Sequence, residues 1–284
     1  MKTYCSKPSG PTVAQWALAL VAAALLTFAA FPARAGNVNA TLIAEQDAAV
    51  PVEVLWVAMR QDIREGWHTY WRNPGDSGQA SVIKWQDLPV GVAVGSIEWP
   101  WPERIPYGPL MNYGYHGVVL LPVPVHIPAN FSADEITLRA RGEWLVCADV
   151  CIPEDGELSL TLPVRSTSMP SSSAAEFREV RARTPTSLGM PVEANLQGEQ
   201  IVLRLQVPGL VPERVASVAY LPYTEALIDN PAPQTWSIDG EGLELTVTQG
   251  WDYTPDANLD GLLLIEETAG GTLQVGFEIA PVAA

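Results

Sequence analysis

Short stretches in which apolar and polar residues alternate recur along most of the chain. In the first half they cover residues 52–58, 136–141 and 158–162, and in the second half 201–207, 243–247 and 273–279. Successive side chains of a β-strand point to opposite faces of a sheet, so a period of two indicates strands with one buried face. The 25 prolines and 22 glycines are scattered between these stretches, as in β-sandwiches and barrels. The pattern predicts an all-β fold.

Residues 118–127 depart from this alternation, because they are almost continuously apolar. Pro122 and Pro124 lie inside the stretch. Proline has no backbone N–H to donate to a neighbouring strand, and within sheets it is found at edges and bulges. We therefore predict an edge strand or a bulged strand here.

A serine-rich run separates the two halves of the chain between residues 166 and 186. Within it, Ser173 and Glu176 have the spacing of a helix capping box, and Phe177 and Val180 follow. These features predict a short helix. The sequence leaves open whether the helix lies free within an interdomain linker or packs on one of the sheets.

Two β-sandwich domains are predicted on either side of this run. We place the first at residues 36–165 and the second at residues 187–284, with residues 166–186 as the linker. Beyond residue 35, every cysteine and every histidine falls in the first domain. The second domain is therefore expected to be structural or to bind a partner.

The first 35 residues have the organisation of a secretory signal peptide. Lys2 and Lys7 form a basic start, residues 13–31 are apolar with few interruptions, and Ala-Arg-Ala at residues 33–35 is a small-x-small cleavage pattern. The segment predicts export to the periplasm. The apolar stretch approaches the length that spans a membrane, so an uncleaved anchor is the alternative.

The charge balance excludes some classes of protein. The chain has 32 acidic residues against 16 basic ones, a net charge of −16, and the predicted signal peptide contains no acidic residue. Binding to nucleic acid or anionic lipid through positive charge is therefore not expected. No hydrolase pattern, phosphate-binding glycine loop or nucleotide fingerprint is visible, and no cofactor is expected.

Cys147 and Cys151 are the only cysteines outside the predicted signal peptide, which contains Cys5. Thiols this close usually pair in an oxidising compartment. Four residues of extended chain span roughly 13 Å, whereas a disulfide requires Cα atoms about 4.4–6.8 Å apart. The segment therefore has to turn after a strand that ends near Val146, and Pro153 is a suitable exit.

The residues alone leave the role of this bridge open. A ring this short contributes only about 2 kcal/mol through loop-closure entropy, and a strained short bridge is easily reduced. The acids Glu143, Asp149, Glu154 and Asp155 are expected to raise the pKa of the thiols, so the reduced pair would be a modest nucleophile. A structural bridge and a reactive pair are equally consistent with these features.

Three segments resemble the periplasmic amino-terminal domain of DsbD-type thiol:disulfide interchange proteins. Residues 144–153, Trp-Leu-Val-Cys-Ala-Asp-Val-Cys-Ile-Pro, and the strand that follows resemble the cysteine motif of this family. Residues 66–78 resemble an early family strand and turn, and residues 99–108 its loop over the cysteines. The resemblance covers most of residues 40–165 and is nearest to the branch associated with suppression of copper sensitivity.

This resemblance implies an immunoglobulin-like fold and a protein-disulfide reductase component without a cofactor. In the family, the cysteine pair accepts electrons from a membrane-embedded reductase module and reduces thioredoxin-like periplasmic proteins. The family's site positions correspond here to the catalytic pair Cys147 and Cys151, to Glu103 and Tyr107 in the shielding loop, and to His68 and Tyr70 near the disulfide.

Two positions depart from the family pattern. The Cys-x3-Cys spacing is shorter than in the best-known members, and Pro106 stands where a shielding aromatic residue is expected, although Tyr107 beside it can replace that aromatic. The membrane module and the terminal thioredoxin-like module of the family are missing from the sequence. The protein is therefore expected to work with separate chains or to be part of a longer one.

Two other interpretations fit some of these residues. His68, His116, His126 and Met111 invite a copper site with the cysteines, because thiolate and thioether ligands suit Cu(I). The aromatic residues between positions 67 and 115 are explained either by a carbohydrate or peptide groove or by a sandwich core. The rival to a redox carrier is thus a non-catalytic module that binds a protein or a copper ion and has a structural disulfide.

The geometry of a redox site can be anticipated in two respects. We expect an aromatic side chain from residues 99–115, in the first place Tyr107, to pack over the disulfide and shield it. We expect Cys151 to be the exposed sulfur that a partner attacks first, because Cys147 closes a strand whereas Cys151 lies near the exit of the turn.

Overall fold

The computed structural model describes residues 36–186, 192–207, 209–240, 242–268 and 272–277. The predicted signal peptide lies outside these residues. Among the residues described, no helix is long and apolar enough to cross a membrane. Most of the described chain is in antiparallel strands, so the all-β prediction is confirmed.

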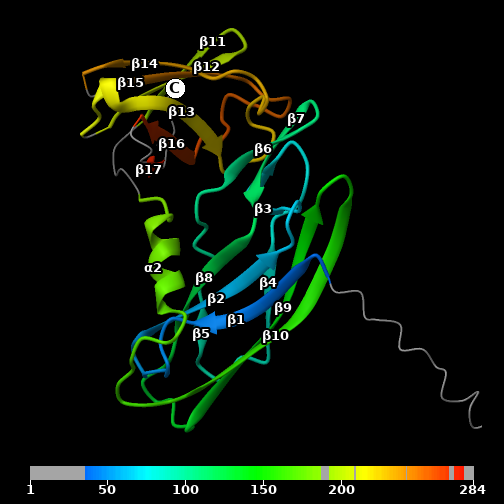
Figure 1. Cartoon of the computed structure of the whole chain (residues 1–284). Coiled ribbons are helices and arrows are strands. Elements are labelled where there is room, and N and C mark those ends of the chain that lie inside the picture. The colour runs from blue at the N-terminus through cyan, green and yellow to red at the C-terminus, as the bar shows by residue number, and fades with distance from the viewer. Residues whose placement is uncertain (1–35, 187–191, 208, 241, 269–271, 278–284) are drawn as a thin grey trace, which may run out of the picture. The chain divides into compact units, whose positions relative to one another are not determined.

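Strands β1 to β10 form three antiparallel sheets (Figure 1). The four-stranded sheet has the order β1 (Val38–Ala44), β2 (Val54–Ile63), β8 (Val118–His126) and β5 (Ala93–Val94). The second sheet has the order β10 (Cys151–Pro163), β9 (Glu135–Cys147) and β4 (Val82–Gln86). The third has the order β3 (Thr69–Gly75), β7 (Leu110–Tyr115) and β6 (Glu103–Tyr107).

The predicted strand at residues 52–58 begins two residues later than its alternation indicates. Val52 has a φ of 67° and is 75% exposed, and β2 starts at Val54. A positive φ is incompatible with extended backbone, so Val52 belongs to the turn that precedes the strand.

β8 contains the two prolines and lies between β2 and the short strand β5, so it is not an edge strand along its whole length. On the β5 side, Gly95 donates its backbone N–H to the carbonyl oxygen of Pro124, and Glu98 donates to Pro122, both at 2.8 Å. Both prolines therefore take part in hydrogen bonding on this side through their carbonyl oxygens, which need no proline N–H.

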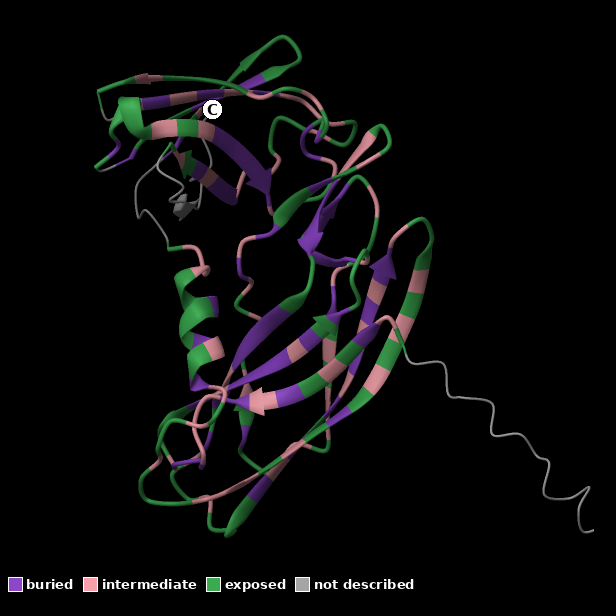
Figure 2. Ribbon diagram, viewed as in Figure 1, coloured by how far each residue is buried: buried purple, intermediate pink, exposed green. Residues whose placement is uncertain are grey.

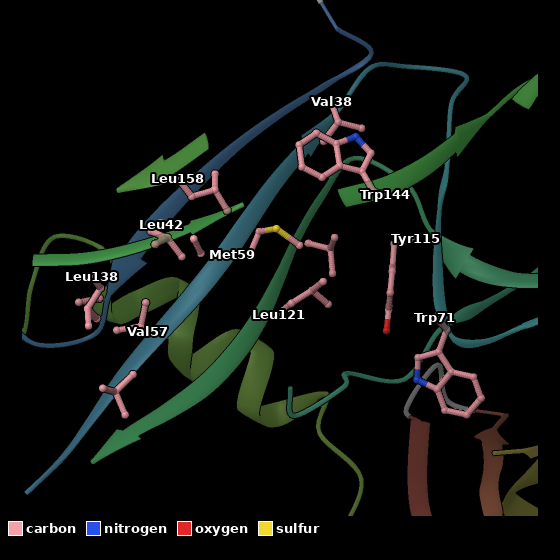
Figure 3. Packing of buried hydrophobic residues seen from close by; sticks show 14 of the residues in the cluster. Val38, Leu42, Val57, Met59, Trp71, Tyr115, Leu121, Leu138, Trp144 and Leu158 are labelled. Carbon is pink, nitrogen blue, oxygen red and sulfur yellow. The ribbon is translucent and has the colours of Figure 1, made fainter. Parts of the chain in front are cut away.

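The main core lies where the β1–β2–β8 sheet faces the β9–β10 hairpin. Met59 of β2, Leu121 of β8 and Leu138 and Trp144 of β9 pack together there (Figure 3). A Cβ atom at Gly142 would lie 2.9 Å from both the Met59 sulfur and the Trp144 ring, so only glycine fits at this point. Figure 2 shows β2 and β8 largely buried and β10 in alternating exposed and half-buried bands, as period two predicts.

The predicted helix is α2 (Ala174–Ala182), and it packs on a sheet. Phe177 and Val180 are buried against Ala58 of β2 and Leu120 of β8. Of the two alternatives for this helix, the structure therefore shows the packed one.

The capping box predicted for α2 does not form. Ser173 is the N-cap residue, but its side chain makes no capping hydrogen bond. Glu176 instead accepts a hydrogen bond from Arg60 of β2 at 2.8 Å. The acid therefore ties the helix to the sheet rather than closing its own first turn.

Strands β11 to β17 form two further antiparallel sheets. One has the order β11 (Glu193–Gln197), β12 (Gln200–Gln206), β15 (Gly242–Thr248) and β14 (Thr235–Asp239). The other has the order β13 (Val215–Pro222), β16 (Gly261–Glu267) and β17 (Thr272–Phe277), and the 3-10 turn η1 (Pro212–Arg214) precedes β13. Their inward-facing residues, among them Leu203 and Leu245, form a separate core cluster.

Buried contacts connect the two groups of sheets. The side-chain amide of Asn73, in β3, donates to the carbonyl oxygens of Pro222 at 2.7 Å and Thr224 at 3.2 Å. Ala219 and Leu221 of β13 belong to the core cluster of the first group. The described residues from Asn37 onward accordingly form one compact unit. The proposed domain boundaries at 165 and 187 stay a prediction.

Candidate functional site

The cysteine pair lies at the tip of the β9–β10 hairpin. The two 13-residue strands pair in register from Glu135 opposite Pro163 to Cys147 opposite Cys151. The two cysteines form a disulfide, and their Cα atoms are 4.1 Å apart. The turn that the spacing predicts is therefore present, and the disulfide joins the last residue pair before it.

The two cysteines differ strongly in exposure. Cys147 is fully buried, and its backbone N–H and carbonyl are both hydrogen-bonded to the backbone of His68 at 2.9 Å. Cys151 is exposed, and the preceding Val150 is 59% exposed. Cys151 is thus exposed, as we expected. That a partner attacks the Cys151 sulfur first stays a prediction.

His68 and Tyr70 lie directly behind the disulfide. The Tyr70 hydroxyl is 3.8 Å from the Cys151 sulfur and 3.2 Å from Nε2 of His68, and both side chains are buried. A Cβ atom at Gly78, whose φ is +115°, would come within 2.2 Å of the Tyr70 ring. The absence of a side chain at position 78 therefore makes room for this ring.

Burial keeps both groups uncharged at neutral pH. It lowers the pKa of His68 from 6.5 to about 4, and the charge of His116 acts in the same direction. Burial also raises the pKa of Tyr70 to about 12, with a further contribution from Tyr107. A neutral imidazole and a protonated phenol can exchange hydrogen-bond donor and acceptor roles with each other and with sulfur.

Tyr107 reaches the cysteine hairpin from β6. Its hydroxyl donates a hydrogen bond to the carbonyl oxygen of Asp149 at 3.2 Å, within the turn that the disulfide closes. The loop predicted over the cysteines is thus the β6–β7 hairpin, and Tyr107 contacts the turn while Cys151 stays exposed. Pro106 beside it is exposed.

Glu103 bonds a histidine rather than the cysteine hairpin. Its Oε2 lies 2.9 Å from Nδ1 of His116, and the His116 ring centroid is 5.7 Å from that of His68. In the sequence, His116 stands out only as a candidate metal ligand. The pairing of β6 with β7 around Gly108 brings residues 103 and 116 together. No alternation of apolar and polar residues in the sequence predicted that hairpin.

The acids near the cysteines are largely paired with positive or donor groups. Glu143 accepts two bonds from Lys84 at 2.7 Å, and Asp155 pairs with Arg141 at 2.9 Å. Glu154 accepts bonds from the Asn37 backbone and side chain. The predicted rise in thiol pKa therefore depends mainly on Asp149, which lies inside the ring.

The two alternative interpretations receive no support from the geometry. Within the part of the chain that the structure describes, no group of three or more His, Cys, Asp or Glu residues could hold a metal ion. The aromatic side chains serve the core. Trp71, Tyr113 and Tyr115 are buried, and Trp99 and Trp101 pack against the same cluster.

The site is thus a disulfide at a hairpin tip of an all-β fold, in which one cysteine is exposed and the other is buried. Residues 39–163 match the family described as thiol:disulfide interchange protein DsbD, N-terminal. This match supports a DsbD-type N-terminal domain over this part of the chain, as the cysteine segment led us to expect.

A solved structure shows the same fold. The chain is similar to the N-terminal periplasmic domain of ScsB from Proteus mirabilis, with a TM-score of 0.56 and 20% identity over 84% of this chain and 93% of that chain. A protein of unknown function from Porphyromonas gingivalis W83 covers 86% of this chain and 99% of its own at 12% identity, but its TM-score of 0.27 supports no conclusion. None of the curated proteins compared matches the sequence.

Proposed function

We propose that the protein is a periplasmic thiol–disulfide exchange module that passes electrons from a membrane-embedded reductase partner to thioredoxin-like proteins. The family of residues 39–163 supports the class of reaction, and the predicted signal peptide supports the compartment. The membrane partner is a separate chain or a further part of a longer one. In this role the protein is a component of a protein-disulfide reductase, and Cys147 and Cys151 are its catalytic residues.

The unequal exposure of the two cysteines is the observation that carries this proposal. Thiol–disulfide exchange requires attack along the axis of the sulfur–sulfur bond, so one sulfur has to be reachable. Cys151 is exposed and Cys147 is fully buried. A structural bridge would gain nothing from an exposed sulfur, and a sequence separation of 4 constrains the unfolded chain little.

The exchange transfers two electrons to the partner. In the reduced protein, the Cys151 thiolate attacks one sulfur of the partner's disulfide and releases the other as a thiolate. Cys147 then loses its proton to water, and its thiolate attacks the Cys151 sulfur of the mixed disulfide. The bond to the partner breaks, the two thiolates of the partner take up protons from water to give the dithiol, and the Cys147–Cys151 disulfide re-forms. A dithiol of the membrane partner reduces this disulfide by the same chemistry.

Tyr107 is proposed to restrict access to this site. Its hydroxyl is bonded to the turn that holds the disulfide, and its side chain is half-buried. A partner that docks at the hairpin tip has to displace this contact, which is a single hydrogen bond worth about 1 kcal/mol. Small thiols without a docking surface are then disfavoured relative to a protein partner.

Trapping of the mixed disulfide tests the proposed function. Reduced Cys147→Ala and Cys151→Ala variants are mixed separately with periplasmic thioredoxin-like proteins that lack their resolving cysteine and whose remaining cysteine is joined to thionitrobenzoate by a disulfide bond, so that attack by the variant's thiolate releases thionitrobenzoate. We expect the variant that retains Cys151 to form a mixed disulfide, and the variant that retains only the buried Cys147 to form little. A double variant is the control. Failure of both single variants to be trapped would favour a structural disulfide.

A further inference from the structure

A line of four side chains leads from the surface to the exposed sulfur. Oε2 of Glu103 lies 2.9 Å from Nδ1 of His116, whose ring centroid is 5.7 Å from that of His68. Nε2 of His68 lies 3.2 Å from the Tyr70 hydroxyl, which is 3.8 Å from the Cys151 sulfur. The outer pair is exposed, with 43% of the His116 and 53% of the Glu103 side chain accessible, and the inner pair is buried.

The inner pair can donate a hydrogen bond to a thiolate. Tyr70 keeps its proton at neutral pH, since burial raises its pKa to about 12, and His68 stays neutral. With its proton on Nε2, His68 donates to the Tyr70 oxygen, and the Tyr70 hydrogen is then free to point at the Cys151 sulfur. A hydrogen bond to the charged form of an acid stabilises that form, so this arrangement favours the thiolate.

The outer pair adds a charge that depends on pH. Glu103 and His116 form an ion pair when the imidazole is charged. The positive charge faces His68 and disfavours its protonation.

We propose that His116, anchored by Glu103, is a positioning residue that acts through His68 and Tyr70 to stabilise the Cys151 thiolate, so that the reactivity of Cys151 depends on the charge of His116. This inference rests on the proposed function and gives His116 and Glu103 a role in its site. The charged and titratable groups around the line are Glu103 and Tyr107 from β6, Tyr70 from β3, and Asp149 from the hairpin turn. Asp149 opposes the effect and is present in every variant below.

The test is the rate at which iodoacetamide alkylates Cys151 in the reduced mature chain, in a Cys147→Ala background, from about pH 5 to pH 9. The labelled residue is identified by peptide mass spectrometry. A nearby positive charge lowers a thiol pKa by about one unit and so increases the fraction of thiolate. A more acidic thiol is also a weaker nucleophile, which offsets part of this increase in rate. We therefore expect His116→Gln to lower the rate about threefold near pH 6 and to match the parent protein near pH 9.

Three further variants separate charge from structure. His116→Lys retains a positive charge and is expected to keep the parent rate near pH 6. Glu103→Gln removes the ion-pair partner that anchors His116 and is expected to lower the rate near pH 6. In a Tyr70→Phe background, His116→Gln is expected to have a smaller effect, since the path through the hydroxyl is gone.

His126→Gln is the matched control, because His126 is an exposed histidine on β8 that pairs with Val54. It is expected to leave the rate unchanged. The proposal is overturned if His116→Gln behaves like His126→Gln, or if His116→Lys is as slow as His116→Gln. Iodoacetamide needs no protein partner, so this result stands apart from trapping, in which failure would count against the proposed function alone.

Discussion

At the scale of residues, the difference in exposure between Cys147 and Cys151 depends on the segment that runs from His68 into β3. His68 is bonded to the Cys147 backbone, and Tyr70, two residues further, lies behind the Cys151 sulfur. Residues two apart in an extended segment point to the same face, so both side chains face the hairpin tip. The resemblance to the DsbD family led us to expect His68 and Tyr70 near the disulfide, whereas the link from His68 to His116 and Glu103 comes from the structure.

Gly78 provides a test of how tightly Tyr70 is held. A Gly78→Ala substitution places a Cβ atom 2.2 Å from the Tyr70 ring at a φ of +115°. Gly66→Ala is the matched control, because Gly66 has a φ of +80° and no atom within 4 Å of the added Cβ. We expect Gly66→Ala to lower the free energy of unfolding by about 1 kcal/mol through backbone strain alone. Gly78→Ala should cost about 2 kcal/mol more through steric overlap. Equal losses in urea denaturation would contradict this packing.

The buried His68 predicts a dependence of stability on pH. Its pKa is about 4 in the native state against 6.5 ordinarily, so the unfolded state binds more protons between these two values. Stability therefore falls as the pH drops from about 6.5 to 4, by an amount on the order of 2 kcal/mol. We expect a His68→Gln variant to lose less stability than the wild type over this range. Parallel curves of unfolding free energy against pH for the two proteins would contradict the burial of a neutral imidazole.

At the scale of elements, the sequence predicts best where strands alternate regularly. The β9–β10 hairpin was visible from its period of two, and the cysteine spacing required the turn between them. The β6–β7 hairpin was not visible as a hairpin, because Pro106 and Gly108 interrupt a short aromatic segment without alternation. The residues on which α2 packs could not be predicted from the sequence either. Phe177 contacts Ala58 and Leu120, which are far from it in the sequence, and no local pattern encodes such tertiary contacts.

The packing of α2 can be tested at Phe177, which is fully buried between the helix and the sheet. We expect Phe177→Ala to lower the free energy of unfolding by about 3–5 kcal/mol, the usual cost of removing a buried phenylalanine ring. Glu179→Ala changes an exposed position on the same helix and should stay within about 0.5 kcal/mol. A loss below about 1 kcal/mol for Phe177→Ala would indicate that the helix is not held on β2 and β8.

At the scale of the whole molecule, the chemistry is concentrated in the first group of sheets. The disulfide and its neighbouring side chains come from β3, β6, β9 and β10, and the second group contains no cysteine or histidine. We propose that the second group, residues 187–284, supports or positions the first, to which Asn73 and the β13 residues connect it. The net charge of −16 favours partners whose docking surface is basic.

The reduction potential of the Cys147–Cys151 pair in the mature protein tests the central claim most directly. It can be measured by equilibrating the protein with dithiol–disulfide buffers and quantifying the two redox forms after acid quenching. Structural disulfides of secreted proteins have potentials below about −300 mV, whereas exposed, exchanging ones are more easily reduced. The proposed electron-transfer role predicts a value above about −300 mV. A value well below it would identify the bridge as structural and contradict the account.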